Sequence, residues 1–330
     1  MGYAQIYCTV DELVADLRLN GDDGTLLSRI RQACAHLTQE LGNFIPITEQ
    51  RTFLAPDDEL QCELDPIIAI TAITMDGTAL TASDYRLAPY DKMWGDGPYL
   101  WIVQLDDDSN ETEWDEEKLV ITGRWSKYER TAATGLTLAS QTDSATTLVV
   151  TDGSKVSVGM VLKVEDEQEL VTGFSAWTDS TADCNEIDES QEEFAVTDAT
   201  KFSVGETLKI GFEQMKVLDI NGYTVLATRG WNNTRKASHT SGSAVNVMRT
   251  FTVERGVNGT TAAAHTSKAI SQMVAPDDVN WLARQVAGLM RMKASAGFAS
   301  KTGNSELGEA FYYNEFPRQI ETVRRNYWTR

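Results

Sequence analysis

The spacing of hydrophobic positions near the N-terminus predicts two helices. In 9–19, Thr9 and Glu12 have the spacing of a capping box, in which each side chain bonds the other residue's backbone N–H. Across 23–41 apolar residues recur on one helical face, and Gly42 follows as a stop signal. That face consists of Leu26, Ile30, Ala33, Cys34, Leu37 and Leu41.

Between 51 and 125 the helical period gives way to β-branched runs and turn signals. The segment 51–66 predicts a hairpin, and 67–89 predicts a strand, a turn at Asp76-Gly77 and a return strand. Two further strands are predicted over 97–105 and 118–125. We therefore expect a β-hairpin region after the two helices.

A helical period returns in 275–297. Pro276 and two acidic residues suit a helix N-terminus, and one face carries Val279, Leu282, Val286 and Leu289. Beyond Gly297 no helical period is present until Pro317, which can begin a final helix.

An internal repeat lies between these regions. The segment 196–245 is a complete copy, 150–173 matches its front half, and 250–266 matches its back half. We interpret this as one unit interrupted by a second copy of itself; two tandem units, one with half of it lost, are the alternative. Unit A then comprises 146–173 and 249–271, and unit B comprises 194–247. Alternating apolar residues and Asn221-Gly222 predict β structure in both units.

The predicted fold class is therefore α+β. A helical core with a β-hairpin region is formed by 1–130 and 273–330, and it carries an inserted, mainly-β module at 131–272 made of the two nested units. The acidic stretch 175–193 is interpreted as a linker inside that module. A folded insert whose ends lie close together avoids most of the loop-closure cost.

Composition limits the function. The chain has 330 residues and a formal net charge of −20, which argues against a protein that binds nucleic acid tightly through Lys and Arg. No apolar run reaches the ~18–20 residues that a membrane span needs. The four cysteines form no C-x-x-C pair, so we expect reduced thiols, with no disulfide framework and no zinc site.

Candidate chemistry is sparse. The acidic loop 106–117 places Asp106, Asp108, Asn110 and Glu117 in a calcium-loop register, but the required glycine is absent, so a solvated hairpin tip is preferred. The chain lacks G-x-S-x-G, H-E-x-x-H, P-loop and dinucleotide-binding glycine motifs, so we expect no enzyme, no metal and no cofactor. His239 and His265 occupy equivalent places in the two units, which favours turn or packing roles.

The order of these elements, with the stretch from Asp65 to Leu87 ("DPIIAITAITMDGTALTASDYRL") followed by "KLVITGRW" and a long helix, resembles the head–tail connector (adaptor) proteins of tailed bacteriophages. The likeness covers about 5–130 and 275–300. It implies a virion protein made in the host cytoplasm and located in the neck, at the portal vertex. It also implies a homo-oligomeric ring, commonly of twelve subunits, that binds the portal protein and a downstream neck or tail protein. DNA passes through such a ring during packaging and ejection without sequence-specific contact.

The C-terminal segment 297–330 is the predicted portal-docking segment. It combines aromatic residues with arginine, the types that dominate interface hot spots. The docking residues are Phe311, Tyr312, Tyr313, Phe316, Arg318, Arg324, Arg325, Tyr327 and Trp328. We expect this segment to order on its partner, and packing on its own domain is the alternative. A decoration, fibre or carbohydrate-binding protein, with its activity in the β module, is the alternative function.

Overall fold

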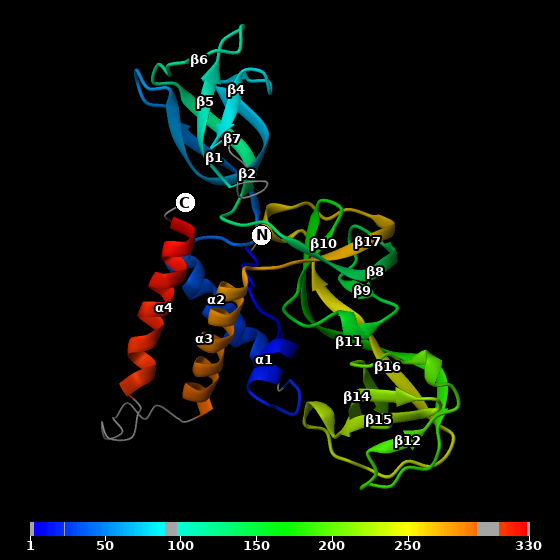
Figure 1. Cartoon of the computed structure of the whole chain (residues 1–330). Helices are drawn as coiled ribbons and strands as arrows, with labels where there is room; N and C mark the ends of the chain where they lie inside the picture. Colours follow the sequence, from blue (N-terminus) through cyan, green and yellow to red (C-terminus); the bar gives the residue numbers. More distant parts are fainter. Residues whose placement is uncertain (1–2, 23, 90–97, 296–309, 329–330) are drawn as a thin grey trace.

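The computed structural model describes residues 3–22, 24–89, 98–295 and 310–328. Within these residues the chain is mostly β, with 45% strand and 21% helix arranged as two large antiparallel sheets and four helices. The prediction of an α+β protein with a helical core is therefore wrong. The helical periods in the sequence are real, but they account for one body only, and the strand segments build two others (Figure 1).

The helices come from both ends of the chain and pack side by side (Figure 1). They are α1 (Val10–Asp16), α2 (Leu26–Leu41), α3 (Asp277–Ser295) and α4 (Ala310–Trp328). The predicted capping box at the start of α1 is confirmed, because Thr9 and Glu12 each accept a hydrogen bond from the other's backbone N–H. The predicted helix over 23–41 begins three residues later, at Leu26.

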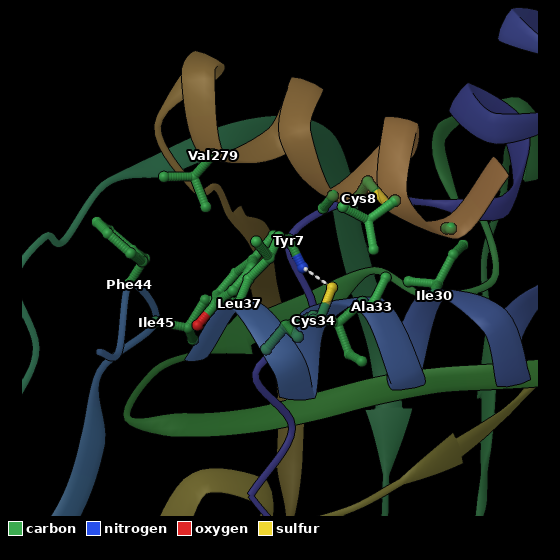
Figure 2. Packing of buried hydrophobic residues seen from close by; sticks show 14 of the residues in the cluster. Tyr7, Cys8, Ile30, Ala33, Cys34, Leu37, Phe44, Ile45 and Val279 are labelled. Carbon is green, nitrogen blue, oxygen red and sulfur yellow. Dashed lines mark hydrogen bonds between the residues drawn. The ribbon is translucent and has the colours of Figure 1, made fainter. Parts of the chain in front are cut away.

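The core between these helices also takes in the extended N-terminal segment (Figure 2). Tyr7 packs edge-on against Phe44 with ring centroids 5.8 Å apart, and its backbone N–H donates to the Cys34 Sγ over 3.3 Å. A hydrogen bond with Cys34, together with burial, raises the pKa of the Cys8 thiol well above its ordinary value. All four cysteines are free and buried, so their thiols act as small packing groups.

The first sheet has seven strands and its own hydrophobic core around Trp114 and Trp125. Its strands are β1 (Ile47–Leu54), β2 (Gln61–Met75), β3 (Thr78–Ala79), β4 (Tyr85–Ala88), β5 (Tyr99–Leu105), β6 (Glu111–Thr112) and β7 (Lys118–Trp125). The main order is β1-β7-β2-β5-β4, so β1 and β2 are not neighbours and the predicted 51–66 hairpin is wrong. Pro66 does not end β2, because a register shift between Glu63 and Ile67 lets the strand continue past it.

The second sheet has ten strands and spans both repeat units. Its strands are β8 (Thr131–Gln141), β9 (Thr147–Val149), β10 (Val161–Val164), β11 (Glu167–Cys184), β12 (Glu193–Ala195), β13 (Thr207–Ile210), β14 (Glu213–Asn221), β15 (Thr224–Arg229), β16 (Ser243–Glu254) and β17 (His265–Met273). The order is β12-β15-β14-β13-β16-β11-β10-β17-β8, with β9 paired to β16.

Strands β11 and β16 form a two-stranded ribbon that runs from one unit into the other. Their register begins at Leu170 opposite Glu254 and ends at Cys184 opposite Ser243. The interpretation of 175–193 as a linker is therefore wrong for its first half, because 175–184 lies within β11. At the end of β11, exposed polar residues alternate with buried Ala182 and Cys184. The polar and acidic residues around them make this strand pattern hard to recognise in the sequence.

The two repeat copies fold alike. Each begins with a short 3-10 helix capped by an aspartate, η1 (Gly153–Lys155) and η2 (Ala199–Lys201), and continues into a hairpin, β10–β11 or β13–β14. Each ends in a second 3-10 turn, η4 (Val257–Gly259) or η3 (Trp231–Asn233), that follows a left-handed glycine. Unit A also contributes Val161, Leu170 and Val257 to the hydrophobic core of the helices.

The last helix differs from its prediction. Helix α4 begins at Ala310, so Pro317 lies inside it and does not begin it. No helix within the described residues is both long and apolar enough to span a membrane.

Candidate interaction site

The predicted helix faces lie against one another. Leu26, Ile30, Leu37 and Leu41 of α2 are fully buried, as are Val279 and Leu282 of α3. Val286 is also buried, whereas Leu289 is half-buried. These faces meet in the single hydrophobic cluster that joins the two ends of the chain.

The C-terminal docking residues are only partly described. The side chains of Phe311, Tyr312, Tyr313, Phe316 and Trp328 lie outside the described residues. Arg318 and Arg325 are exposed. Arg324 pairs with Glu40 over 3.0 Å.

The end of α4 packs on the chain's own helices. The Tyr327 hydroxyl donates to Asp278, and its ring packs edge-on against Phe44 with centroids 5.0 Å apart. Val323 is buried in the helical core and Ile320 is packed against it. This arrangement is the alternative in which the segment packs on its own domain, and it applies here to 320–327.

Unit B holds a buried arginine paired with a buried glutamate. The Arg229 Nε and Nη2 donate to the Glu213 carboxylate over 2.6 and 2.7 Å, and both side chains are fully buried. Its other N–H groups donate to the carbonyl oxygens of Asp188, Gln191 and Ala237. All five N–H donors of the guanidinium are therefore satisfied.

Unit A repeats this arrangement. Arg255 donates to the Glu167 carboxylate over 2.6 and 2.7 Å and to carbonyl oxygens of the adjoining turns. The Gly256 N–H and the Ala263 N–H also donate to Glu167, as the equivalent Gly230 and Ala237 do to Glu213 in unit B. One carboxylate in each unit thus ties the left-handed turn to the hairpin.

The two histidines complete these networks. The His239 Nε2 lies 2.9 Å from Glu213 Oε2, and the His265 Nε2 lies 2.9 Å from Glu167 Oε2. Burial raises the pKa of the Glu213 carboxyl, but hydrogen bonds from Arg229, His239 and a backbone N–H outweigh it and hold that pKa below its ordinary value. Burial and the equivalent hydrogen bonds act on Glu167 in the same way and give the same net direction.

Unit A departs from unit B at one buried position. Glu169 is fully buried where unit B has Met215, and its Oε1 lies 3.1 Å from the Arg255 Nε. Burial raises the pKa of Glu169, and the attraction of Arg255, which acts in the opposite direction, does not offset it. Glu167, Glu169 and His265 have ligand atoms within 4.8 Å of one another, so they could hold a metal ion. The Arg255 guanidinium contacts both carboxylates, however, and a cation has to displace it.

The left-handed turns of both units bind backbone N–H groups near the start of the chain, in the N-terminal segment for unit A and in the loop after α1 for unit B. In unit A the Ala4 N–H donates to Asn258 Oδ1 over 2.7 Å, and the Asn258 amide donates back to the Ala4 carbonyl. In unit B the Asp22 N–H donates to Asn232 Oδ1 over 2.9 Å. Asn258 and Asn232 both have positive φ, which asparagine tolerates better than most residues.

A cleft of about 630 Å³ lies where the helices and both units meet. The helical body contributes Asp11, Asp22 and Arg31, and unit A contributes Phe251. Unit B forms the remaining wall and includes Lys216, whose Nζ lies 3.6 Å from Asp11 and 5.8 Å from the Trp231 ring. Its volume falls in the range of small-ligand and peptide sites.

Few features of the sequence predict this cleft. The duplicated Arg-Gly, Asn and His positions are visible as a repeat, and the partners of the arginines could have been sought among the duplicated glutamates, Glu167 and Glu213. The N-terminal segment carries no signal that it binds to unit A.

No family model, no curated protein and no solved structure matches this chain.

Proposed function

We propose that this chain is a structural subunit of a head–tail connector, which assembles as a ring beneath the portal of a tailed bacteriophage. The proposal is supported by the resemblance of its sequence pattern and by one structural observation. Residues 4–45 and 279–323, separated by more than 230 positions, share one hydrophobic core. The two ends thus behave as one body, as the resemblance implies for an adaptor split by an insert.

Polar contacts across the two ends support the same conclusion. The Asn280 amide donates to the Tyr7 carbonyl and reaches the Glu12 carboxylate that caps α1. Arg284 forms an ion pair with Asp16 at the end of the same helix. A body held by contacts between the chain ends suits a subunit that transmits load within an assembly.

The proposed partners are other copies of the chain, a portal protein and a downstream neck or tail protein. DNA passes through the lumen, where carboxylates from a chain of net charge −20 repel the phosphates and limit adhesion. We assign no catalytic activity, because His239 and His265 are held by buried carboxylates and neither lines the cleft. The arginine–glutamate networks are assigned to turn stability.

Immunogold electron microscopy of intact phage particles that contain this chain tests the proposal. Antibodies raised against the purified chain should label the junction between head and tail, with one labelled position on each particle. Label spread over the capsid or along fibres would instead support a decoration or fibre protein. Absence of the chain from purified, protease-treated particles would also contradict the proposal.

A further inference from the structure

Unit A contains a groove that the chain fills with its own N-terminal segment. The segment begins at Ala4 on Asn258 and ends where the Val10 N–H donates to the Val158 carbonyl over 2.8 Å. The Asp11 N–H donates to the Ser157 Oγ, and a Cβ on Gly159 would meet the Cys8 carbonyl at 3.2 Å. The floor of the groove is Val161, Leu170 and Val257, which join the same hydrophobic cluster as Ala4, Ile6 and Val10.

Unit B has an equivalent groove, and in unit B it forms one wall of the cleft. The equivalents of Gly159, Val161, Gln168, Leu170, Val257 and Asn258 are Gly205, Thr207, Gln214, Lys216, Trp231 and Asn232. All six of these unit B residues line the 630 Å³ cleft. The repeat therefore relates an occupied groove in unit A to an open one in unit B.

The ends of the unit B groove differ in occupancy. At the Asn232 end the loop after α1 contributes the Asp22 N–H, so this end is already in contact with the chain. At the other end Val204, the equivalent of Val158, is 55% exposed. Among the described residues no backbone N–H donates to the Val204 carbonyl or the Ser203 Oγ as Val10 and Asp11 do in unit A.

We infer that the unit B groove is a binding site for an extended peptide segment of a partner protein, and that this segment carries an acidic residue. The backbone mode follows from unit A, where Asn258 binds the backbone of the extended residue Ala4, and the turn carbonyl and the serine hydroxyl accept the first two N–H groups of α1. The acidic residue follows from Lys216, which replaces Leu170.

The position of the acidic residue can be placed from unit A. Ile6 and Leu170 belong to one hydrophobic cluster and line the same pocket in unit A. Lys216 at the equivalent place favours a carboxylate where unit A accepts Ile6. The present partner of Lys216 is Asp11, whose side chain is 56% exposed, and an exposed pair of this kind contributes at most ~1 kcal/mol. A ligand carboxylate can therefore displace Asp11 into solvent.

The chemistry of the groove argues against a second N-terminal segment as occupant. That segment presents Ile6 to an apolar floor, whereas Thr207 and Lys216 give the unit B floor a polar character. Trp231 adds an aromatic face that a side chain next to the acidic residue can cover. The inference does not depend on the proposed ring.

Peptide binding to the full chain tests the inference. The probes are fluorescein-labelled peptides of residues 3–11 carrying Cys8→Ser and either Ile6→Glu or Ile6→Lys, measured by fluorescence anisotropy. The Ile6→Glu peptide should bind about three- to tenfold more tightly than the Ile6→Lys peptide. Lys216→Glu should reverse this preference, and Lys216→Met should abolish it. Lys201→Glu, an equal charge change on exposed η2, should leave it unchanged.

Equal binding of the two peptides, or equal effects of Lys216→Glu and Lys201→Glu, would overturn the inference. A photo-crosslinking residue at Val204 gives an independent measurement that survives if the Lys216 variants fail to fold. It should capture the Ile6→Glu peptide, and the same residue at Leu54, 65% exposed on the other sheet, should not. Capture of a second copy of the chain in place of the peptide would show a homotypic groove and contradict a partner segment.

Discussion

Neutralising the buried glutamate of unit B should strongly lower the free energy of unfolding of that unit. The change is Glu213→Gln, which keeps the shape of the side chain and removes its charge. Arg229 then remains fully buried without a counter-ion. The amide group of the glutamine also turns a donor toward N–H groups of Arg229, Gly230 or Ala237, all of which donate to Glu213.

The expected magnitude follows from comparing the two units. Breaking a buried ion pair by removing one partner costs about 3–5 kcal/mol. Glu167→Gln in unit A is the matched control, and it should cost less, about 1–3 kcal/mol. The reason is that Glu169 lies 3.1 Å from Arg255 and can replace the lost charge, whereas unit B has Met215 there.

Native-state hydrogen exchange resolves the two units separately. Amides of β13, β14 and β15 report the opening free energy of unit B, and those of β10 and β17 report that of unit A. The Glu213 contribution should also depend on pH. Because the folded-state pKa of Glu213 is lowered, its stabilisation is present above the ordinary glutamate pKa and is lost as the pH falls through the folded value.

The reasoning would be refuted by equal losses for Glu213→Gln and Glu167→Gln, or by a larger loss in unit A. A double variant, Glu213→Gln with Arg229→Met, provides a further check. It should be more stable than Glu213→Gln alone, because no buried charge is left without a partner. A double variant that is less stable than the single one would show that the guanidinium contributes chiefly through its carbonyl contacts.

Three further predictions rest on other parts of the chain. Glu169→Gln should raise the stability of unit A by about 1 kcal/mol at neutral pH, and the gain should vanish below pH ~4, where the carboxyl is protonated in both states; urea unfolding at two pH values measures it. Burial lowers the pKa of Lys127 to about 8, so wild-type stability should rise by about 1–2 kcal/mol relative to Lys127→Met between pH 8 and 10.5. Replacing 178–247 by Asn-Gly should leave the helices folded by circular dichroism, because Trp177 and Met248 already lie opposite each other in the ribbon; loss of helical signal would contradict this.

Local signals in the sequence predict the structure correctly where contacts within a few residues decide the geometry. The capping box at Thr9 and the Asp76-Gly77 turn depend on contacts within a few residues, and both are present. The apolar stripe of α2 is likewise buried as a face. Such features need no knowledge of distant partners, which is why the sequence suffices for them.

The errors concern pairings between distant segments. The hairpin predicted over 51–66 assumed that neighbours in sequence are neighbours in the sheet, whereas β7 lies between β1 and β2. A helical core was predicted because helical periods are easy to recognise in a sequence. A strand such as β11 combines exposed acidic residues with buried ones and therefore resembles a linker. The cleft could not be predicted for the same reason, since its walls come from three separate parts of the chain.

The two grooves differ in their floors but not in the residues that shape them, a pattern that random loss does not explain. Unit B keeps the elements that shape the groove, since Gly205, Gln214 and Asn232 are identical to their unit A equivalents. The Asn232 amide still donates to Gln214 over 2.8 Å, as Asn258 does to Gln168 over 2.9 Å. The changes fall on the floor, where Lys216 and Trp231 replace aliphatic residues. An unused groove would instead be free to lose the residues that shape it. The retained frame and the altered floor together indicate a site with a different occupant.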